Sequence, residues 1–207
     1  MPIDLARLID PAHTALVTQE IQQGVVGAGS ALPDLAAGVS RVGLVAHVAA
    51  LLDAARHAGV TIVHCTAERR PDGLGANRNA RLFQYMAKAE QPLHPGTEAA
   101  ALLPGIGARD DELVLARLHG LSPFQGTELD SVLRNEGVTT IVGVGVSVNV
   151  AIQNFAFDAV NASYQMVIPR DGVAGFPPEY VEQVFANTLG AISTLTTTAD
   201  ILDVWRG

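Results

Sequence analysis

Two charged residues stand where the sequence predicts that strands end. Glu20 directly follows an apolar run at 14–19, and Arg117 closes another at 113–116. Sites in an open α/β sheet collect at the carboxyl ends of the strands, so both side chains are candidates for chemistry. A carboxyl group can transfer a proton, whereas a guanidinium stays protonated and offers a planar fork that suits a carboxylate. The alternatives are a solvated loop acid and a surface arginine in an ion pair.

A glycine-rich turn between a strand and a helix is the third candidate. The β-branched run at 139–142 predicts a buried strand, and Gly143 and Gly145 follow it. From Ser147 onward the apolar residues have helical spacing, and Ser147 or Asn149 can cap that helix. Because the first turn of such a helix points into the crevice at the strand end, this turn is a usual place for a site.

The elements that must position these residues alternate along the chain. Strands are expected at 14–19, 60–65, 112–116, 139–142, 165–169 and 193–196. Helices are expected at 39–58, 77–89, 129–136, 147–159 and 178–189, with a long irregular connection at 24–38. Alternating strands and helices imply a parallel sheet with helices on both faces, and right-handed crossovers make it doubly wound. We therefore predict one α/β domain over residues 1–207, a Rossmann-like three-layer α/β/α sandwich.

The composition is that of a well-buried globular chain. Of the 207 residues, 48% are hydrophobic and 16% are charged, which excludes a disordered chain. The net charge of −8 argues against nucleic acid or an anionic membrane as a partner. No apolar run approaches the roughly 20 residues that cross a bilayer, and no signal peptide is expected. We expect a cytoplasmic protein, and the high Ala and Gly content with little Lys is typical of a GC-rich bacterial source.

The remaining nucleophiles and ligands give weaker signals. Cys65 is the single cysteine, which excludes an internal disulfide and favours a reducing compartment; we interpret it as a buried strand cysteine. Ser147 and Ser122 carry hydroxyl groups, but neither has an evident His–Asp relay. The six histidines are scattered, which favours structural roles over a metal site. The glycine-containing stretch at 73–77 lacks a dinucleotide or phosphate-loop pattern, so no cofactor is predicted.

Three segments resemble the isochorismatase-like, or cysteine hydrolase, superfamily. Residues 145–152, GVSVNVAI, are similar to its nucleophile turn G-V-x-T-N-x-C-V, with Ala151 where the cysteine is expected. Residues 20–22, EIQ, are similar to its D-x-Q motif, in which the aspartate is the general acid/base. Residues 122–129 are similar to its S-A-F-x-G-T-x-L run, and Arg117 lies near the place of the catalytic lysine.

The resemblance implies a fold and a set of site residues. It implies the doubly wound α/β fold, with catalytic positions at Glu20, Arg117 and Ala151, of which Ala151 is inert. The binding positions that it implies are Gln22, Val146, Ser147 and Phe124. It also implies a cis peptide bond between Val146 and Ser147, in a turn that aims backbone N–H groups at an oxyanion, and a homo-oligomer. The D-x-H pair of nicotinamidase-type members is absent after the second strand, so no metal is expected.

Two functions follow from these substitutions. Amide hydrolysis by the family's cysteine needs a thiolate, which Ala151 cannot supply. The first hypothesis is therefore a hydrolase of a small carboxylate-bearing substrate, such as a vinyl ether, with Glu20 as the acid and Arg117 holding the carboxylate. The alternative is a catalytically silent member that binds a small anion or a protein partner.

Overall fold

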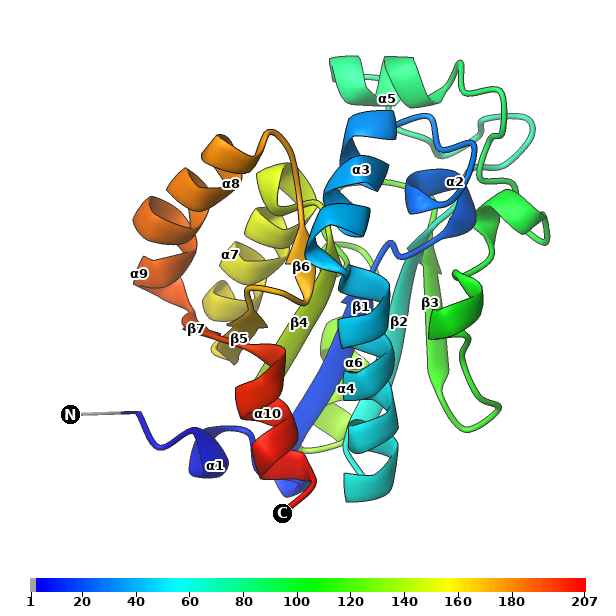
Figure 1. Cartoon of the computed structure of the whole chain (residues 1–207). Coiled ribbons are helices and arrows are strands. Elements are labelled where there is room, and N and C mark those ends of the chain that lie inside the picture. The colour runs from blue at the N-terminus through cyan, green and yellow to red at the C-terminus, as the bar shows by residue number, and fades with distance from the viewer. Residues whose placement is uncertain (1–2) are drawn as a thin grey trace.

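A single parallel sheet forms the centre of the computed structural model, which describes residues 3–207 (Figure 1). Its strands are β1 (Thr14–Gln19), β2 (Thr61–Ala67), β3 (Leu113–Arg117), β4 (Thr140–Val146), β5 (Gln165–Pro169), β6 (Val173–Ala174) and β7 (Thr194–Thr196). The main order is β3-β2-β1-β4-β5-β7, with β6 beside β4, and every strand pair is parallel. The chain reverses its direction of winding between β1 and β4, so the predicted doubly wound sheet is confirmed.

Helices connect the strands and cover the sheet. The α-helices are α1 (Leu5–Leu8), α2 (Gln23–Val26), α3 (Pro33–Val42), α4 (Leu44–Ala58), α5 (Arg81–Met86), α6 (Leu129–Asn135), α7 (Gln153–Asn161), α8 (Pro178–Val184), α9 (Gly190–Ile192) and α10 (Thr198–Trp205). Short 3₁₀ turns lie at η1 (Pro11–His13), η2 (Glu98–Ala100) and η3 (Pro104–Ile106), and π-helical turns at η4 (Val148–Ile152) and η5 (Phe185–Leu189).

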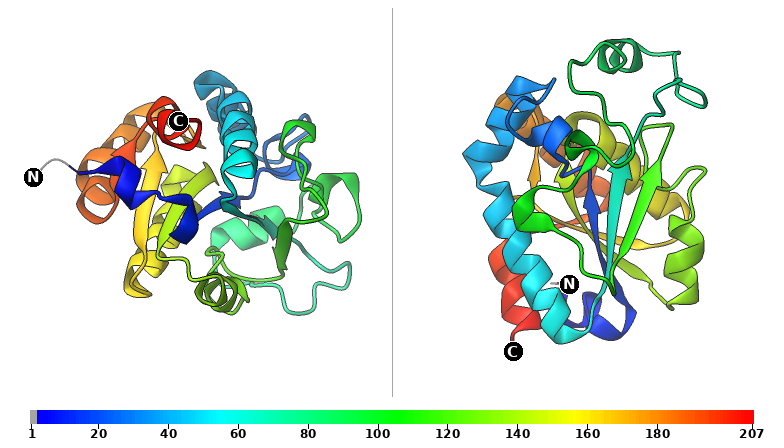
Figure 2. Two further views of the ribbon diagram at one scale, coloured as in Figure 1. Left: turned by 90° about the horizontal axis from the view of Figure 1, so that it is seen from below. Right: turned by 90° about the vertical axis from the view of Figure 1, so that its right-hand side faces the viewer.

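Two apolar cores lie on opposite faces of the sheet. Alternate residues of β1 divide between them: Leu16 packs in the core under α3, α4 and α10, whereas Ala15 and Val17 pack in the core under α6, α7 and η5. Seen along the strands, the two helical layers lie on either side of the sheet (Figure 2, left). This is the three-layer sandwich that the alternation of elements predicts.

The prediction of an irregular connection at 24–38 is wrong, because this segment contains most of α2 and the first part of α3. Pro33 at the first helical position and Asp34 in the first turn both favour a helix start there. Gly43, with φ of 65°, then ends α3 and starts α4, which splits the expected helix at 39–58. In residues 3–207 no single helix has the length and apolar composition of a membrane span; α3 and α4 reach both only together, bent by 60°.

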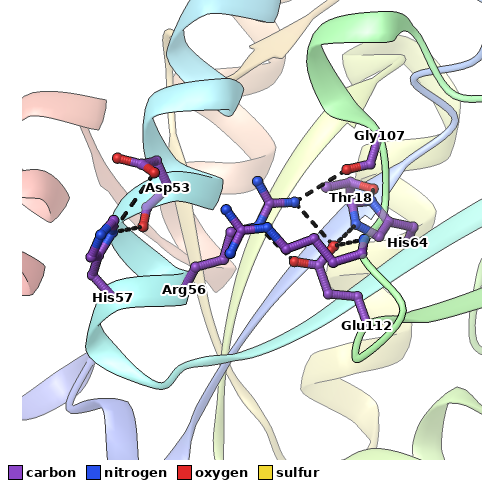
Figure 3. A network of polar contacts seen from close by, with 8 residues as sticks. Thr18, Asp53, Arg56, His57, His64, Gly107 and Glu112 are labelled. Carbon is purple, nitrogen blue, oxygen red and sulfur yellow. Dashed lines mark hydrogen bonds and ion pairs between the residues drawn. The ribbon is translucent and has the colours of Figure 1, made fainter.

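A buried polar network fixes the start of β3 (Figure 3). The His64 ring bonds Thr18 Oγ1 through Nδ1 at 3.0 Å and Glu112 Oε2 through Nε2 at 3.1 Å. Arg56 of α4 donates to both Glu112 oxygens, at 2.7 and 3.0 Å, and to the carbonyl of Gly107 at 3.2 Å. The network joins β1, β2, α4 and the loop before β3, and it therefore helps to fix the strand that carries Arg117 at its far end.

Candidate active site

Glu20 and Arg117 meet at the carboxyl end of the sheet. Arg117 Nη2 donates a hydrogen bond to Glu20 Oε1, and Gln19 Nε2 donates to the same oxygen at 3.0 Å. The Arg117 side chain is 4% exposed and the Glu20 side chain 16%. The chain turns sharply after β1, since Glu20 adopts the left-handed region with φ of 52°, which is uncommon for a residue other than glycine. This turn carries the Glu20 carboxylate across the end of β2 toward β3.

The two carboxylate oxygens of Glu20 have different surroundings. Oε1 accepts hydrogen bonds from Arg117 Nη2 and Gln19 Nε2. Neither of these nitrogens can accept a hydrogen bond from a protonated Oε1. Among residues 3–207, none donates a hydrogen bond to Oε2. A proton on this carboxyl group therefore resides on Oε2, and Oε2 is the oxygen that can exchange it with a substrate.

The Arg117 guanidinium is only partly hydrogen bonded. Its Nη2 also approaches the carbonyl of Leu121, at 3.4 Å, but Nε and Nη1 are buried and have no partner among residues 3–207. Buried N–H groups are nearly always hydrogen bonded in proteins, so these two atoms are exceptions. Because Arg117 lines the pocket, its positive charge can attract an anionic ligand there.

An open pocket with a cavity volume of about 150 Å³ lies over this ion pair. Its floor contains Glu20 and Arg117, and its charged rim contains Glu68 and Arg69, which follow β2. Helix α5 lies above the carboxyl ends of the strands (Figure 2, right), and its apolar residues line the pocket. The other residues that line it are Val25, Leu32, Ala67, Ala76, Asn77, Leu82, Phe83, Met86, Ala89, Gln91, Pro92, Leu93, Leu118, His119, Gly120 and Leu121.

The turn after β4 lies outside this pocket. The peptide bond between Val146 and Ser147 is cis, as predicted. Ser147 is half-buried and Ala151 is 6% exposed, and in the described part of the chain neither residue lines the pocket. Neither Ser147 nor Asn149 caps the helix: the Asn149 amide instead bonds both backbone groups of Phe176. The structure thus brings Glu20 and Arg117 together at the pocket and leaves Ala151 beside it.

The other predicted binding residues lie beneath the site. Gln22 is fully buried, and its amide bonds Ala67 N, Ala67 O and Ala100 O at 2.8 to 2.9 Å, so the side chain fastens two loops together. Phe124 packs against Phe155 at a ring separation of 5.7 Å. Val146 is fully buried in the core on the α4 side. The side chains at these three positions are occupied by protein contacts, and their binding role stays a prediction.

Cys65 is no substitute for the missing nucleophile. It is 2% exposed within β2, paired in register with Gln19 and Leu115. Burial raises the pKa of the Cys65 thiol to about 12; the Glu20 charge adds to this rise and the Arg117 charge opposes it. A thiol with this pKa carries almost no thiolate near neutral pH, so it cannot attack a carbonyl.

Sequence reasoning missed the contribution of two loops. His119 and Asn77 both line the pocket, and Asn77 Oδ1 accepts a hydrogen bond from Gly120 N at 2.8 Å. The signal was their position: the residues after 117 and the segment covering the strand ends face any ligand at this edge. His64 is instead buried in the polar network, and among residues 3–207 no three His, Cys, Asp or Glu side chains come together as a metal site would require.

The strand order defines a doubly wound α/β protein, and comparisons with known proteins agree with this fold. The family model named Isochorismatase domain matches residues 14–200. The ureidoacrylate amidohydrolase RutB of Rhizobium rhizogenes is 28% identical over 84% of this chain and 76% of its own length. A protein of Arabidopsis thaliana named "Probable inactive nicotinamidase" is 28% identical over 81% of this chain and 83% of its own.

A solved structure shows the same fold. The cysteine hydrolase of Pseudomonas syringae pv. phaseolicola superposes with a TM-score of 0.81 over 96% of this chain and 95% of that chain, at 22% identity. The chain therefore belongs to the isochorismatase domain family, and relatives such as RutB are hydrolases.

Proposed function

We propose that this protein hydrolyses a small carboxylate-bearing substrate by acid/base chemistry, without a cysteine nucleophile. The observation that carries the proposal is the arrangement of Glu20 and Arg117 on the pocket floor, where Oε2 of Glu20 accepts no hydrogen bond from residues 3–207 and Arg117 supplies a positive charge. Ala151 contributes no nucleophile and does not line the pocket. A reaction that needs only a proton and a water molecule suits this set of groups.

Hydrolysis of a vinyl ether is such a reaction. Oε2 of Glu20 gives its proton to the terminal carbon of the enol ether, which becomes an oxocarbenium ion. Water adds to that ion and returns a proton to Glu20, and the hemiketal collapses to a ketone and an alcohol. The positive charge of Arg117 attracts the substrate carboxylate.

The test is to incubate the purified protein with isochorismate and to follow pyruvate. Wild type is expected to release pyruvate, and Glu20→Gln is expected to abolish the release because the amide cannot give its proton. The exposed acid Glu128 at the start of α6 supplies the matched control, Glu128→Gln, which should keep wild-type activity. No pyruvate from wild type, or equal rates for Glu20→Gln and wild type, would overturn the proposal.

Ureidoacrylate, the substrate named for the relative RutB, is the second compound to assay. It carries a carboxylate, but its hydrolysis breaks a carbon–nitrogen bond. The mechanism proposed here supplies no nucleophilic side chain to form an acyl intermediate, so no hydrolysis of ureidoacrylate is expected.

A catalytically silent protein that binds a small anion is the second candidate. Two features favour this candidate. Hydrogen bonds from Arg117 and Gln19 hold Glu20 Oε1 in place, and alanine at position 151 supplies no nucleophile. The similar chain from Arabidopsis thaliana carries the name "Probable inactive nicotinamidase", which describes a silent protein of this kind. Thermal shift with aromatic and enol acids, followed by product analysis, separates the two: stabilisation without a product selects silent binding.

A further inference from the structure

The apolar side of α5 packs against the pocket and not against the body of the protein. Leu82, Phe83 and Met86 are half-buried and line the pocket, and no residue of this helix is fully buried. Within residues 3–207 these three side chains belong to neither of the two apolar cores. A six-residue helix is marginal alone and depends on burial of its apolar face. Because neither core covers this apolar face, a ligand in the pocket can pack against it.

The opposite wall of the pocket is also apolar. Val25 and Leu32 come from α2 and the loop after it, Leu93 from the loop before η2, and Leu118 and Leu121 from the loop after β3. A ligand on the Glu20–Arg117 floor is therefore surrounded by hydrocarbon above its charged end. Small polar substrates would leave these walls in contact with water, which forgoes the free energy of burying them.

Charged side chains line the pocket beside these apolar walls. Arg69 and Arg117 supply two cations, and Glu20 and Glu68 supply two anions. The two cations can attract the carboxylate of a ligand.

We propose that the ligand is an amphipathic carboxylic acid, with a carboxylate beside Arg117 and an extended apolar chain or ring against Leu82, Phe83 and Met86. The inference rests on the proposed function for the role of Arg117 as a carboxylate site. It does not require that the bound acid be turned over. It names the substrate class of the pocket by its shape and charge.

Calorimetric titration with a series of straight-chain acids from acetate to octanoate tests the inference. The Kd is expected to fall with chain length, by up to about fourfold for each methylene group that is fully buried. Octanamide, which lacks the charge, is expected to bind at least about tenfold more weakly than octanoate, since hydrogen bonds to charged groups are the stronger ones. Equal affinities for acetate and octanoate, or for octanoate and octanamide, would overturn the inference.

Variants of the pocket wall give the matched comparison. Leu82→Ser and Phe83→Ser are expected to weaken octanoate by about tenfold and to leave acetate unchanged, because only the longer acid reaches α5. Leu74→Ser is the control: Leu74 is 68% exposed, precedes α5 and does not line the pocket. Circular dichroism on each variant confirms folding. Loss of acetate and octanoate binding together in both folded wall variants, or a similar loss in Leu74→Ser, would count against the inference.

The outcome for catalysis is separate. Chain-length-dependent binding without hydrolysis of any carboxylate-bearing vinyl ether would refute the proposed hydrolase and keep the ligand class. Pyruvate release from isochorismate with no dependence of affinity on chain length would keep the hydrolase and refute the ligand class.

Discussion

Arg117 Nη2 and Glu20 Oε1 are hydrogen bonded, although 97 residues separate them in the sequence. The pair spans the ends of two strands, because β2 lies between β1, which Glu20 follows, and β3, which Arg117 ends. Both side chains are largely buried, so each charge depends on the other for the solvation that water would give it. The same contact is therefore both a structural link across the sheet and the proposed catalytic centre.

Removal of one partner should destabilise the fold more than removal of both. Arg117→Met leaves the Glu20 carboxylate without its cation and is expected to lower the free energy of unfolding by about 3 kcal/mol. Glu20→Gln combined with Arg117→Met restores part of that loss, since no unpaired charge remains. Urea denaturation of the two single variants and the double variant gives the coupling energy. Additive losses would show that the two charges do not depend on each other.

Gly145 at the end of β4 cannot accept a side chain. Its φ is 117°, and an added Cβ would lie 2.2 Å from the carbonyl oxygen of Gln19 on the neighbouring strand. Gly145→Ala is expected to lower the free energy of unfolding by about 3 kcal/mol or more, because the backbone of β1 beside Glu20 must shift. Thermal and urea unfolding measure the loss.

Gly137→Ala provides the control for backbone conformation alone. Gly137 has φ of 70°, and an added Cβ meets nothing within 4 Å. Its substitution is expected to cost about 1 kcal/mol, the usual penalty of the left-handed region. Equal losses at positions 137 and 145 would mean that the contact with Gln19 is relieved without cost.

Sequence patterns predicted the central strands well, because β1, β2 and β4 are buried on both faces and read as nearly continuous apolar runs. The run at 139–142 extends in the structure to Val146, through Gly143, which packs against Met166 and Phe155, and Gly145, which packs against β1. The helix predictions were less accurate than the strand predictions. The predicted helix at 77–89 shrinks to α5 because its apolar face packs against a pocket and not against a core. Helix α10 was not predicted, although Thr197 and Asp200 form a capping box at its start.

The candidate site was predictable in its charges and not in its extent. The position of Glu20 and Arg117 directly at strand ends was enough to indicate that they converge. Sequence alone could not show that the Gln22 side chain bonds loop backbone and that the Phe124 ring packs against Phe155. A buried side chain and a ligand-facing side chain have the same local sequence pattern. The contribution of α5 depends on a long connection that no periodicity describes.

A thiol restored at position 151 should remain unreactive. Ala151 is 6% exposed and does not line the pocket, so the thiol of Ala151→Cys would be buried away from the proposed centre. In a Cys65→Ala background, its alkylation by iodoacetamide is expected to be at least about tenfold slower than that of a free thiol. No hydrolysis of ureidoacrylate is expected from this variant.

The opposite result would be informative. Fast alkylation of Ala151→Cys together with amide hydrolysis would show that Glu20 and Arg117 act on position 151, and that the site extends over the end of β4. Mass spectrometry of the alkylated protein identifies the modified residue and separates the two results.

The buried network of Figure 3 predicts that acid destabilises the fold in two ranges of pH. Burial lowers the pKa of His64 from its ordinary 6.5, with Arg56 adding to the fall and Glu112 opposing it. Below pH 6.5 the unfolded chain therefore binds a proton at His64 that the folded chain does not, so stability decreases as the pH falls. Burial would raise the pKa of Glu112, but the hydrogen bonds from Arg56, the backbone of Arg109 and His64 lower it from 4.5 to about 2.

The Glu112 carboxylate accordingly contributes stability above pH 4.5 that is lost as the pH falls toward about 2. Its side chain is 5% exposed, and the full contribution corresponds to about 3 kcal/mol. Urea unfolding between pH 2 and pH 8 should show that His64→Gln removes the upper part of the acid dependence and Glu112→Gln the lower part. Thr18→Val, which deletes one hydrogen bond and no titrating group, should lower the curve by about 1 kcal/mol without changing its slope. A wild-type curve that stays flat from pH 6.5 to pH 3 would contradict the assigned charges of both residues.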